Sequence, residues 1–576
     1  MLSANKEKLG SFFSGNIQFL IPFFQRAYVW KVENWQELWD DVLEELTAFQ
    51  NGKTDSEHFI GTIIIKSRDT GSLSASTFDL IDGQQRLTTI CLLLRALHDV
   101  STDAALRSFI SNMLVFTDAY GEKHIRIIHS KADTAHFSQL MQSENNNENI
   151  PDAKSRILEG YQWFRNQIGQ IADPADLRNI MNILLEKLPV IHMALSANDD
   201  VQQIFDTINS LGVKLTTGEL LKNYLFSFKE VEPHYKALWQ DVFEEDEETI
   251  AFWEAEKTAG RVPRSNIDLF LYSYLIIKTG ENIKLESLFK EYKAHLKTKT
   301  PTELLSFAQE LAQYANVYAG LPEGKELTDL HFGEHDKRFF HVINEMDVNT
   351  IAPLVLYLYK EVTDPAARQA MIRLLESYIV RRTVCRLTTK NYNNLFISIL
   401  NDLRKSGTLS ADTLRARLEA SDEVTSRFPT DAEFQEGFSR SQLINKYSGE
   451  VLYGIALYQL NHEYQDNRRL SKNGLSVEHL MPKNWTKHWK LPAGSTKAQE
   501  DHRSHKLLTL GNLTLIKGRL NSSLRDSGWA KKQKGLLPFS TLRITTDYLP
   551  KNQWDEAEIE TRAETLFRNA LQIWPR

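Results

Sequence analysis

The sequence is poor in cysteine, with only Cys91 and Cys385 among its 576 residues. Two thiols so far apart in the chain cannot supply a disulfide framework, nor a zinc site built from cysteine pairs. A reducing compartment suits such a chain, and we therefore expect a cytoplasmic protein.

Long hydrophobic runs are also missing. The longest apolar stretch, residues 269–277, is far shorter than the roughly 20 residues that cross a bilayer. The first residues, MLSANK, lack the basic start and apolar run of a signal peptide. No association with a membrane is expected.

The chain has no excess of positive charge, because 68 Lys and Arg face 75 Asp and Glu and give a net charge of -7. Such a charge exerts no global attraction on nucleic acid, so any contact with DNA must come from a local basic patch. The hydrophobic content of 42% is that of an ordinary globular protein. A chain of this length exceeds what one hydrophobic core usually supports, and two or three domains are expected.

The pattern of apolar residues predicts the order of the elements. Short β-branched or aromatic runs predict strands at 58–65 and 77–81, with a hairpin loop between them. Helical spacing predicts one helix around 35–46 and another that follows Asp82-Gly83 and continues to Leu97. Residues 100–440 have a mainly helical pattern, and beyond them the composition turns toward His, Asn and basic residues. We therefore predict an α+β, mostly helical fold.

The glycine turn before the second predicted helix is a candidate phosphate site. A helix N-terminus carries unpaired N–H groups and a partial positive charge, and glycine lets the backbone approach a ligand closely. Glutamine amides and arginine guanidiniums add donors, and Asp82 could hold magnesium or orient a water. In the structural alternative, Asp82 caps the helix and Arg86 pairs with a surface acid. The residues of this predicted site are Gln25, Arg26, Asp82, Gly83, Gln84, Gln85 and Arg86.

A second group of polar residues lies near the C-terminus. The segments 476–482 and 511–516 predict two strands, and the start of a helix would then carry Asn521. Glu478 and His479 are adjacent, so on a strand their side chains point to opposite faces unless the strand ends there, as Pro482 suggests. Phosphodiester hydrolysis needs a base for water and a cation for the charge on the phosphate. An acid, a histidine and two asparagines can provide such a site.

Basic residues are concentrated around these motifs. Residues 503–534 contain eight Lys or Arg and one acid, Asp526. A charge run is usually a solvated face, but beside Glu478 and His479 it indicates contact with phosphates, which positions DNA without specifying its sequence. The candidates for DNA contact are Lys517, Arg519, Arg525, Lys531 and Lys532.

Both groups of residues resemble one known family. The segment Ile21-Pro-Phe-Phe-Gln-Arg-Ala-Tyr-Val-Trp30, with Asp82-Gly-Gln-Gln-Arg86, resembles the N-terminal domain of the GmrSD-type, modification-dependent (type IV) restriction endonucleases. Glu478-His479 with Pro482, the Gly511-Asn-Leu513 motif and the later Asn521 resemble that family's C-terminal HNH (ββα-metal) nuclease domain. The resemblance implies a ParB/sulfiredoxin-like nucleotide-binding domain at 1–100, a helical and possible sensing region at 101–440, and a nuclease domain at 441–576.

The resemblance also implies roles for the nuclease residues. His479 would be the general base, Glu478 and Asn521 would be metal ligands, and Asn512 would orient His479 or shape the loop. Oxygen ligands of this kind favour a hard cation, Mg²⁺ or Mn²⁺, over zinc.

The function implied is that of a nucleotide-regulated, metal-dependent endonuclease that cuts modified phage double-stranded DNA in anti-phage defence. The N-terminal domain would bind or hydrolyse a nucleoside triphosphate. The alternative is a nucleotide-switched DNA-binding regulator, or an NTPase that does not cleave DNA. The sequence leaves the oligomeric state open, and a homo-oligomer is possible.

Overall fold

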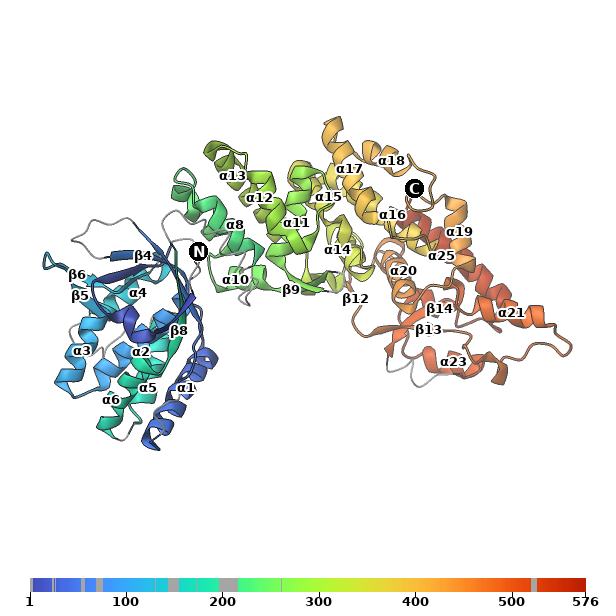
Figure 1. Ribbon diagram of the computed structural model, residues 1–576. Helices are drawn as coiled ribbons and strands as arrows, with labels where there is room; N and C mark the ends of the chain where they lie inside the picture. Colours follow the sequence, from blue (N-terminus) through green and yellow to red (C-terminus); the bar gives the residue numbers. More distant parts are fainter. Residues whose placement is uncertain are drawn as a thin grey trace. The chain divides into compact units, whose positions relative to one another are not determined.

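The computed structural model describes residues 4–22, 25, 27–52, 57–68, 76–129, 131–142, 155–171, 173–195, 216–259, 262–518 and 526–576. The chain forms two compact units, Met1–Phe228 and Lys229–Arg576 (Figure 1). A small mixed sheet and many helices confirm the predicted α+β, mostly helical fold class. No helix within the described ranges is long and apolar enough to cross a membrane.

The N-terminal unit is built on a six-stranded mixed sheet. Its strand order is β1 (Ala4–Lys8), β8 (Pro189–Leu195), β3 (Thr62–Ser67), β4 (Ser76–Asp82), β2 (Ile17–Leu20) and β7 (Ile127–Ile128). The antiparallel pairing of β3 with β4 matches the two strands predicted from the sequence. The first of them begins four residues later than predicted, because Gly61 has a φ of +110°, which interrupts the extended conformation.

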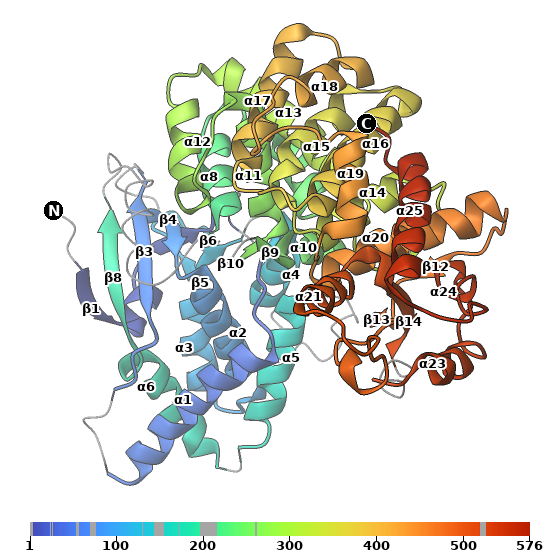
Figure 2. The same cartoon turned by 90° about the vertical axis from the view of Figure 1, so that its right-hand side faces the viewer.

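Helices cover one side of this sheet in both views (Figures 1 and 2). They are α1 (Val32–Gln50), α2 (Gln84–Val100), α3 (Ala104–Leu114), α5 (Arg156–Ile168) and α6 (Pro174–Glu186). Helix α2 is the centre of the layer, since Leu87, Ile90 and Leu93 are fully buried. Helices α1 and α2 confirm the two helices predicted from apolar spacing.

The C-terminal unit begins with a helical region, as the sequence predicts. Its longer helices are α11 (Asn266–Thr279), α13 (Pro301–Ala319), α14 (His335–Glu345), α15 (Ala352–Glu361), α16 (Pro365–Val384), α17 (Tyr392–Ser406) and α19 (Asp431–Arg440).

The last part of the unit contains a β-hairpin of strands β13 (Leu475–His479) and β14 (Leu513–Lys517). Its longer helices are α20 (Asn445–Tyr458), α21 (Lys497–Lys506), α23 (Trp529–Leu536) and α25 (Glu556–Ile573). The hairpin of β13 and β14 lies between α20 and α25 on one side and α23 on the other (Figures 1 and 2).

Buried polar contacts join the helical region to the part that carries the hairpin. His341 of α14 forms a 2.7 Å hydrogen bond with Glu450 of α20. Glu376 of α16 accepts from Arg338 at 3.1 Å and from the indole of Trp574, near the chain end, at 2.8 Å. A buried charge that loses its partner is costly, so these pairs fix how the two parts pack together. Residues 229–576 therefore form one compact unit, and the division of the chain falls at residue 228.

Candidate active site

The β13–β14 hairpin holds the histidine and acid of the predicted nuclease motif. The two strands are antiparallel, with Glu478 opposite Thr514 and His479 opposite Leu513. His479 is the last residue of β13, as the following Pro482 suggested. Consecutive side chains of a strand point to opposite faces; Glu478 is buried, with 5% of its surface exposed, and His479 is half-buried.

The buried face of β13 carries an ion pair. Lys532 of α23 has no exposed surface, and its ammonium group pairs with the Glu478 carboxylate. The same ammonium donates a hydrogen bond of 2.5 Å to the main-chain carbonyl of His479. Burial raises the pKa of Glu478 and lowers the pKa of Lys532, while each charge opposes the shift of its partner.

The imidazole of His479 has the protonation state of a base. Burial, together with the nearby cations Lys483 and Lys532, lowers the pKa of His479 to about 4. The ring is therefore neutral near pH 7 and can accept a proton. Within the described ranges no group forms a hydrogen bond with this ring.

Asn512 lies beneath the loop that follows β13 and is fully buried. Its oxygen accepts from the Met481 N–H at 2.8 Å and from the Trp554 indole at 3.0 Å. Its nitrogen donates to the carbonyls of Met481 and Leu507 at 2.8 and 2.9 Å. The side-chain amide thus accepts two hydrogen bonds and donates two, so all of its hydrogen-bonding capacity is satisfied. These contacts match the loop-shaping role and include none to His479.

Of the two predicted metal ligands, Glu478 alone is among the described residues. Glu478 faces away from His479 and its carboxylate pairs with Lys532, while Asn521 lies outside the described residues. In the parts of the chain that the structure describes, three side chains that could share a cation meet at Asp118, Glu122 and His124 of the N-terminal unit. The residues described around β13 therefore do not by themselves fit a divalent cation.

The chain enters and leaves the segment 519–525 beside the hairpin. The N–H of Gly518 donates to the Gly474 carbonyl at 3.0 Å, next to the start of β13. Asp526 accepts from Asn484, in the loop after β13, at 3.2 Å.

The predicted DNA-binding residues have different surroundings. Lys517 and Lys531 are exposed, Lys532 is buried in its ion pair, and Arg519 and Arg525 lie outside the described residues. Two further cations of the basic segment, Arg503 and Lys506, are buried and pair with Glu556 and Glu560 of α25. Sequence reasoning missed these acids because each lies more than 50 residues after the cation that it pairs with. The free positive charge at this surface is therefore smaller than the sequence suggested.

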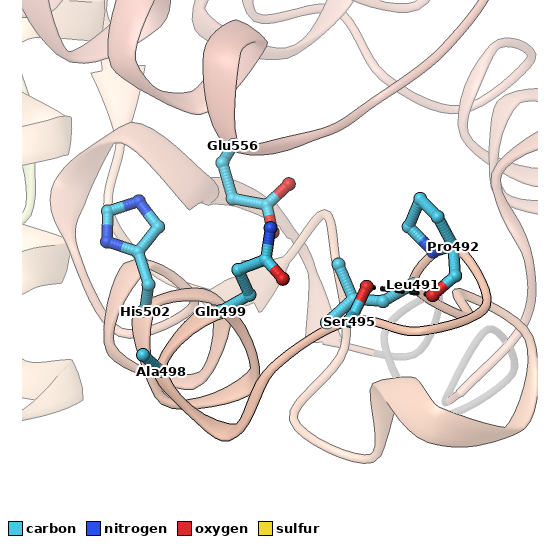
Figure 3. A pocket seen from close by; sticks show the side chains of 7 residues that line it. All are labelled: Leu491, Pro492, Ser495, Ala498, Gln499, His502 and Glu556. Atoms are coloured by element: carbon cyan, nitrogen blue, oxygen red, sulfur yellow. Dashed lines mark hydrogen bonds between the residues drawn. The ribbon is translucent and has the colours of Figure 1, made fainter.

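A pocket of about 390 Å³ opens elsewhere in the same unit. Gln499 and His502 come from α21, and Glu556 begins α25 (Figure 3). The residues that line it are Leu491, Pro492, Ser495, Ala498, Gln499, His502 and Glu556, and none of them belongs to the predicted sites.

The glycine turn of the N-terminal unit precedes α2, as predicted. Gly83 is the N-cap residue of α2, with a φ of +93°, and it has no side chain with which to cap the helix. A Cβ atom at Gly83 would lie 3.0 Å from Ile63, so the turn packs tightly against β3. Gly83, which follows Asp82, therefore occupies the position at which the first N–H groups of α2 begin.

Two of the predicted glutamines brace the segment between β2 and α1. Gln85 accepts from the Val29 N–H at 2.9 Å and donates to the Ala27 carbonyl at 3.0 Å. Gln25 donates to the carbonyls of Leu80 and Ile81, at the end of β4, at 2.8 and 3.0 Å. Both amides are thus engaged with main chain.

Arg86 lies against the backbone of β3. Its guanidinium donates to the Thr62 carbonyl at 2.6 Å, and a Cβ atom at Gly61 would lie 2.7 Å from its Cζ. Arg86 is half-buried and bonds a carbonyl here, where the structural alternative expected a surface acid. Gln84 is also half-buried, and Arg26 lies outside the described residues.

Two family models match the chain. Residues 9–226 match the N-terminal domain, and residues 428–569 the C-terminal domain, of the GmrSD restriction endonucleases. A search of curated proteins found no match. The matched domains define the chain as a restriction endonuclease, with nuclease activity and DNA as its partner. It belongs to the GmrSD family, and the resemblance seen in the sequence is confirmed.

Proposed function

We propose that the nuclease centre is of the HNH type and that His479 is its general base. The observation that carries the proposal is the position of the His479 imidazole, which has no hydrogen-bond partner in the described chain, at the end of the first strand of an antiparallel hairpin. In cleavage, the His479 ring would accept a proton from the attacking water. Asn512 fixes the loop beyond His479, and the exposed Lys517 and Lys531 would contact DNA phosphates together with Arg519 and Arg525.

Mg²⁺ or Mn²⁺ is the proposed cation. A bound cation would offset negative charge on the phosphate and the leaving oxygen. Asn521 remains a proposed ligand, whereas the pairing of Glu478 with Lys532 argues against the other predicted ligand. The proton transfer assigned to His479 does not depend on which residues hold the cation.

The N-terminal unit is proposed to bind a nucleoside triphosphate and to couple its binding or hydrolysis to cleavage. The support is the glycine turn at Gly83 that leads into the N-terminus of α2, with the guanidinium of Arg86 in the first turn of that helix. Gln84 and Asp82 lie at the same turn, while Gln25 and Gln85 would keep the adjoining segment in place. Arg26 remains a candidate for a second cationic side chain beside Arg86 at the phosphates.

The proposed role is type IV restriction of modified phage double-stranded DNA in the cytoplasm. Its test is cleavage of modified phage DNA and unmodified plasmid with Mg²⁺ or Mn²⁺, with and without each triphosphate. Wild type should cut, the triphosphate should change the rate, and His479→Ala should lower cleavage about 100- to 10,000-fold. His488→Ala is the matched control, because His488 is an exposed histidine of the same region.

Other outcomes of this experiment would point elsewhere. If His479→Ala cut as fast as wild type, another centre would perform the cleavage. If wild type bound DNA and hydrolysed triphosphate without cutting any substrate, the chain would act as a nucleotide-switched DNA-binding regulator.

A further inference from the structure

The buried pair of Glu478 and Lys532 has no part in the proton transfer assigned to His479. The two residues are 54 positions apart in the sequence, and the fold brings α23 under β13 so that they meet. Lys532 has no exposed surface and Glu478 has 5%. Neither charge can reach DNA from this position.

A buried ion pair is a weak source of stability. Removing an ammonium and a carboxylate from water costs about as much as their attraction returns, and apolar residues of similar volume often serve the fold as well. Retaining the pair makes most sense where it fixes a particular geometry. The geometry available here is that of the catalytic strand.

The Lys532 ammonium also fixes the peptide group of His479. It donates to the His479 carbonyl at 2.5 Å, while its other bond holds the preceding side chain. Beyond this point the Leu480 N–H donates to the Asn512 carbonyl at 3.0 Å, and the Asn512 amide holds Met481. The main chain is thus fastened at three consecutive residues.

We infer that Glu478 is the counter-ion of Lys532 and not a metal ligand, and that this pair positions His479. The inference rests on the proposed role of His479. Lys532 and Glu478 act through the main chain of β13 and are positioning residues. A divalent cation at this centre would take its ligands from elsewhere.

Three variants of the full chain test the inference: Lys532→Met, Glu478→Gln and the double variant. Methionine and glutamine keep the side-chain volumes and remove the charges. The double variant leaves no unpaired charge buried, so it should fold even if a single variant does not. Lys551→Met is the control, since Lys551 is an exposed lysine outside the basic segment 503–534.

Three kinds of measurement are made on each protein. They are the dissociation constant of Mn²⁺ by calorimetry with and without bound duplex DNA, the kcat and KM of cleavage, and the thermal unfolding midpoint. We expect Mn²⁺ binding to stay within about twofold of wild type in all variants. Each single variant should lose about 10- to 100-fold in kcat with KM unchanged, as small misplacements of catalytic groups do.

The double variant should show that the two residues act as one unit. Its loss in kcat and its shift in unfolding midpoint should both be smaller than the combined effects of the single variants. Lys551→Met should match wild type in all of these quantities.

Two results would overturn the inference. A tenfold or greater weakening of Mn²⁺ binding in Glu478→Gln would make Glu478 a metal ligand. A folded Lys532→Met protein with wild-type kcat would remove the positioning role. If wild type cuts no DNA, the proposed function fails by itself. Additive midpoint shifts would then reject the pair, and non-additive shifts with unchanged Mn²⁺ binding would support the counter-ion assignment.

Discussion

The two motifs of this chain use polar residues in different ways. At the start of α2 the side chains of Gln25 and Gln85 bond main chain, and the groups proposed to bind a ligand are the N–H groups of the helix and the Arg86 guanidinium. At the end of β13 the main chain is held by Asn512 and Lys532, and the group proposed for chemistry is the His479 side chain. The proposed nucleotide site therefore depends on backbone geometry as well as on side chains, whereas the proposed nuclease site depends on one side chain that the backbone positions.

The largest effect is expected at the brace of the catalytic loop. Asn512→Ala removes four buried hydrogen bonds and leaves the Met481 main chain unsatisfied. We expect a loss of about 3 to 5 kcal/mol in the free energy of unfolding, measured by denaturant titration. Asn484→Ala, which removes one exposed bond, is the control and should cost less than 1 kcal/mol, roughly one net hydrogen bond. Equal losses in both variants would contradict the role given to Asn512.

A pH dependence should follow from His479. Its pKa in the folded protein, about 4, lies below the usual histidine value of 6.5, so the unfolded chain binds more protons between these values. Stability contributed by the neutral ring is present above pH 6.5 and is lost as pH falls toward 4, by about 2 to 3 kcal/mol. His479→Asn should flatten this part of the stability curve. A curve of unchanged slope would show that the ring is not buried neutral.

The N-terminal turn should respond to a single methyl group. Gly83→Ala places a Cβ atom 3.0 Å from Ile63 at a φ of +93°. We expect a loss of about 1 to 2 kcal/mol in stability and weaker triphosphate binding, measured by unfolding and calorimetry. Gly52→Ala has a similar positive φ with no atom within 4 Å, so it separates backbone strain from crowding. Equal effects on triphosphate binding in both variants would argue against a ligand site at Gly83.

The smallest effect is expected at the exposed lysines. Lys531→Ala should weaken DNA binding by less than 1 kcal/mol and reduce the slope of log affinity against log salt by about one. The measurement is a salt titration of DNA affinity, with Lys551→Ala as a control outside the predicted basic segment. An unchanged slope would remove Lys531 from the DNA surface.

Much of the local structure followed from sequence patterns. The apolar spacing of 35–46 and 84–97 predicted α1 and α2, and Pro482 indicated where β13 ends. These features depend on residues within a few positions of one another, so local propensity and periodicity suffice. The resemblance of the two motifs to the GmrSD family was also visible in the residues alone.

Only the tertiary structure could show which polar residues are occupied. In the sequence Lys532 lies among basic residues and is predicted to contact DNA, but the fold buries it against an acid 54 residues away. Arg503 and Lys506 are likewise neutralised by acids of α25, and Gln85 braces a loop 56 residues before it. Charge and hydrogen-bonding capacity are properties of residue types, which the sequence determines. Whether they face a ligand or another part of the chain depends on long-range packing, which decided the partners of each.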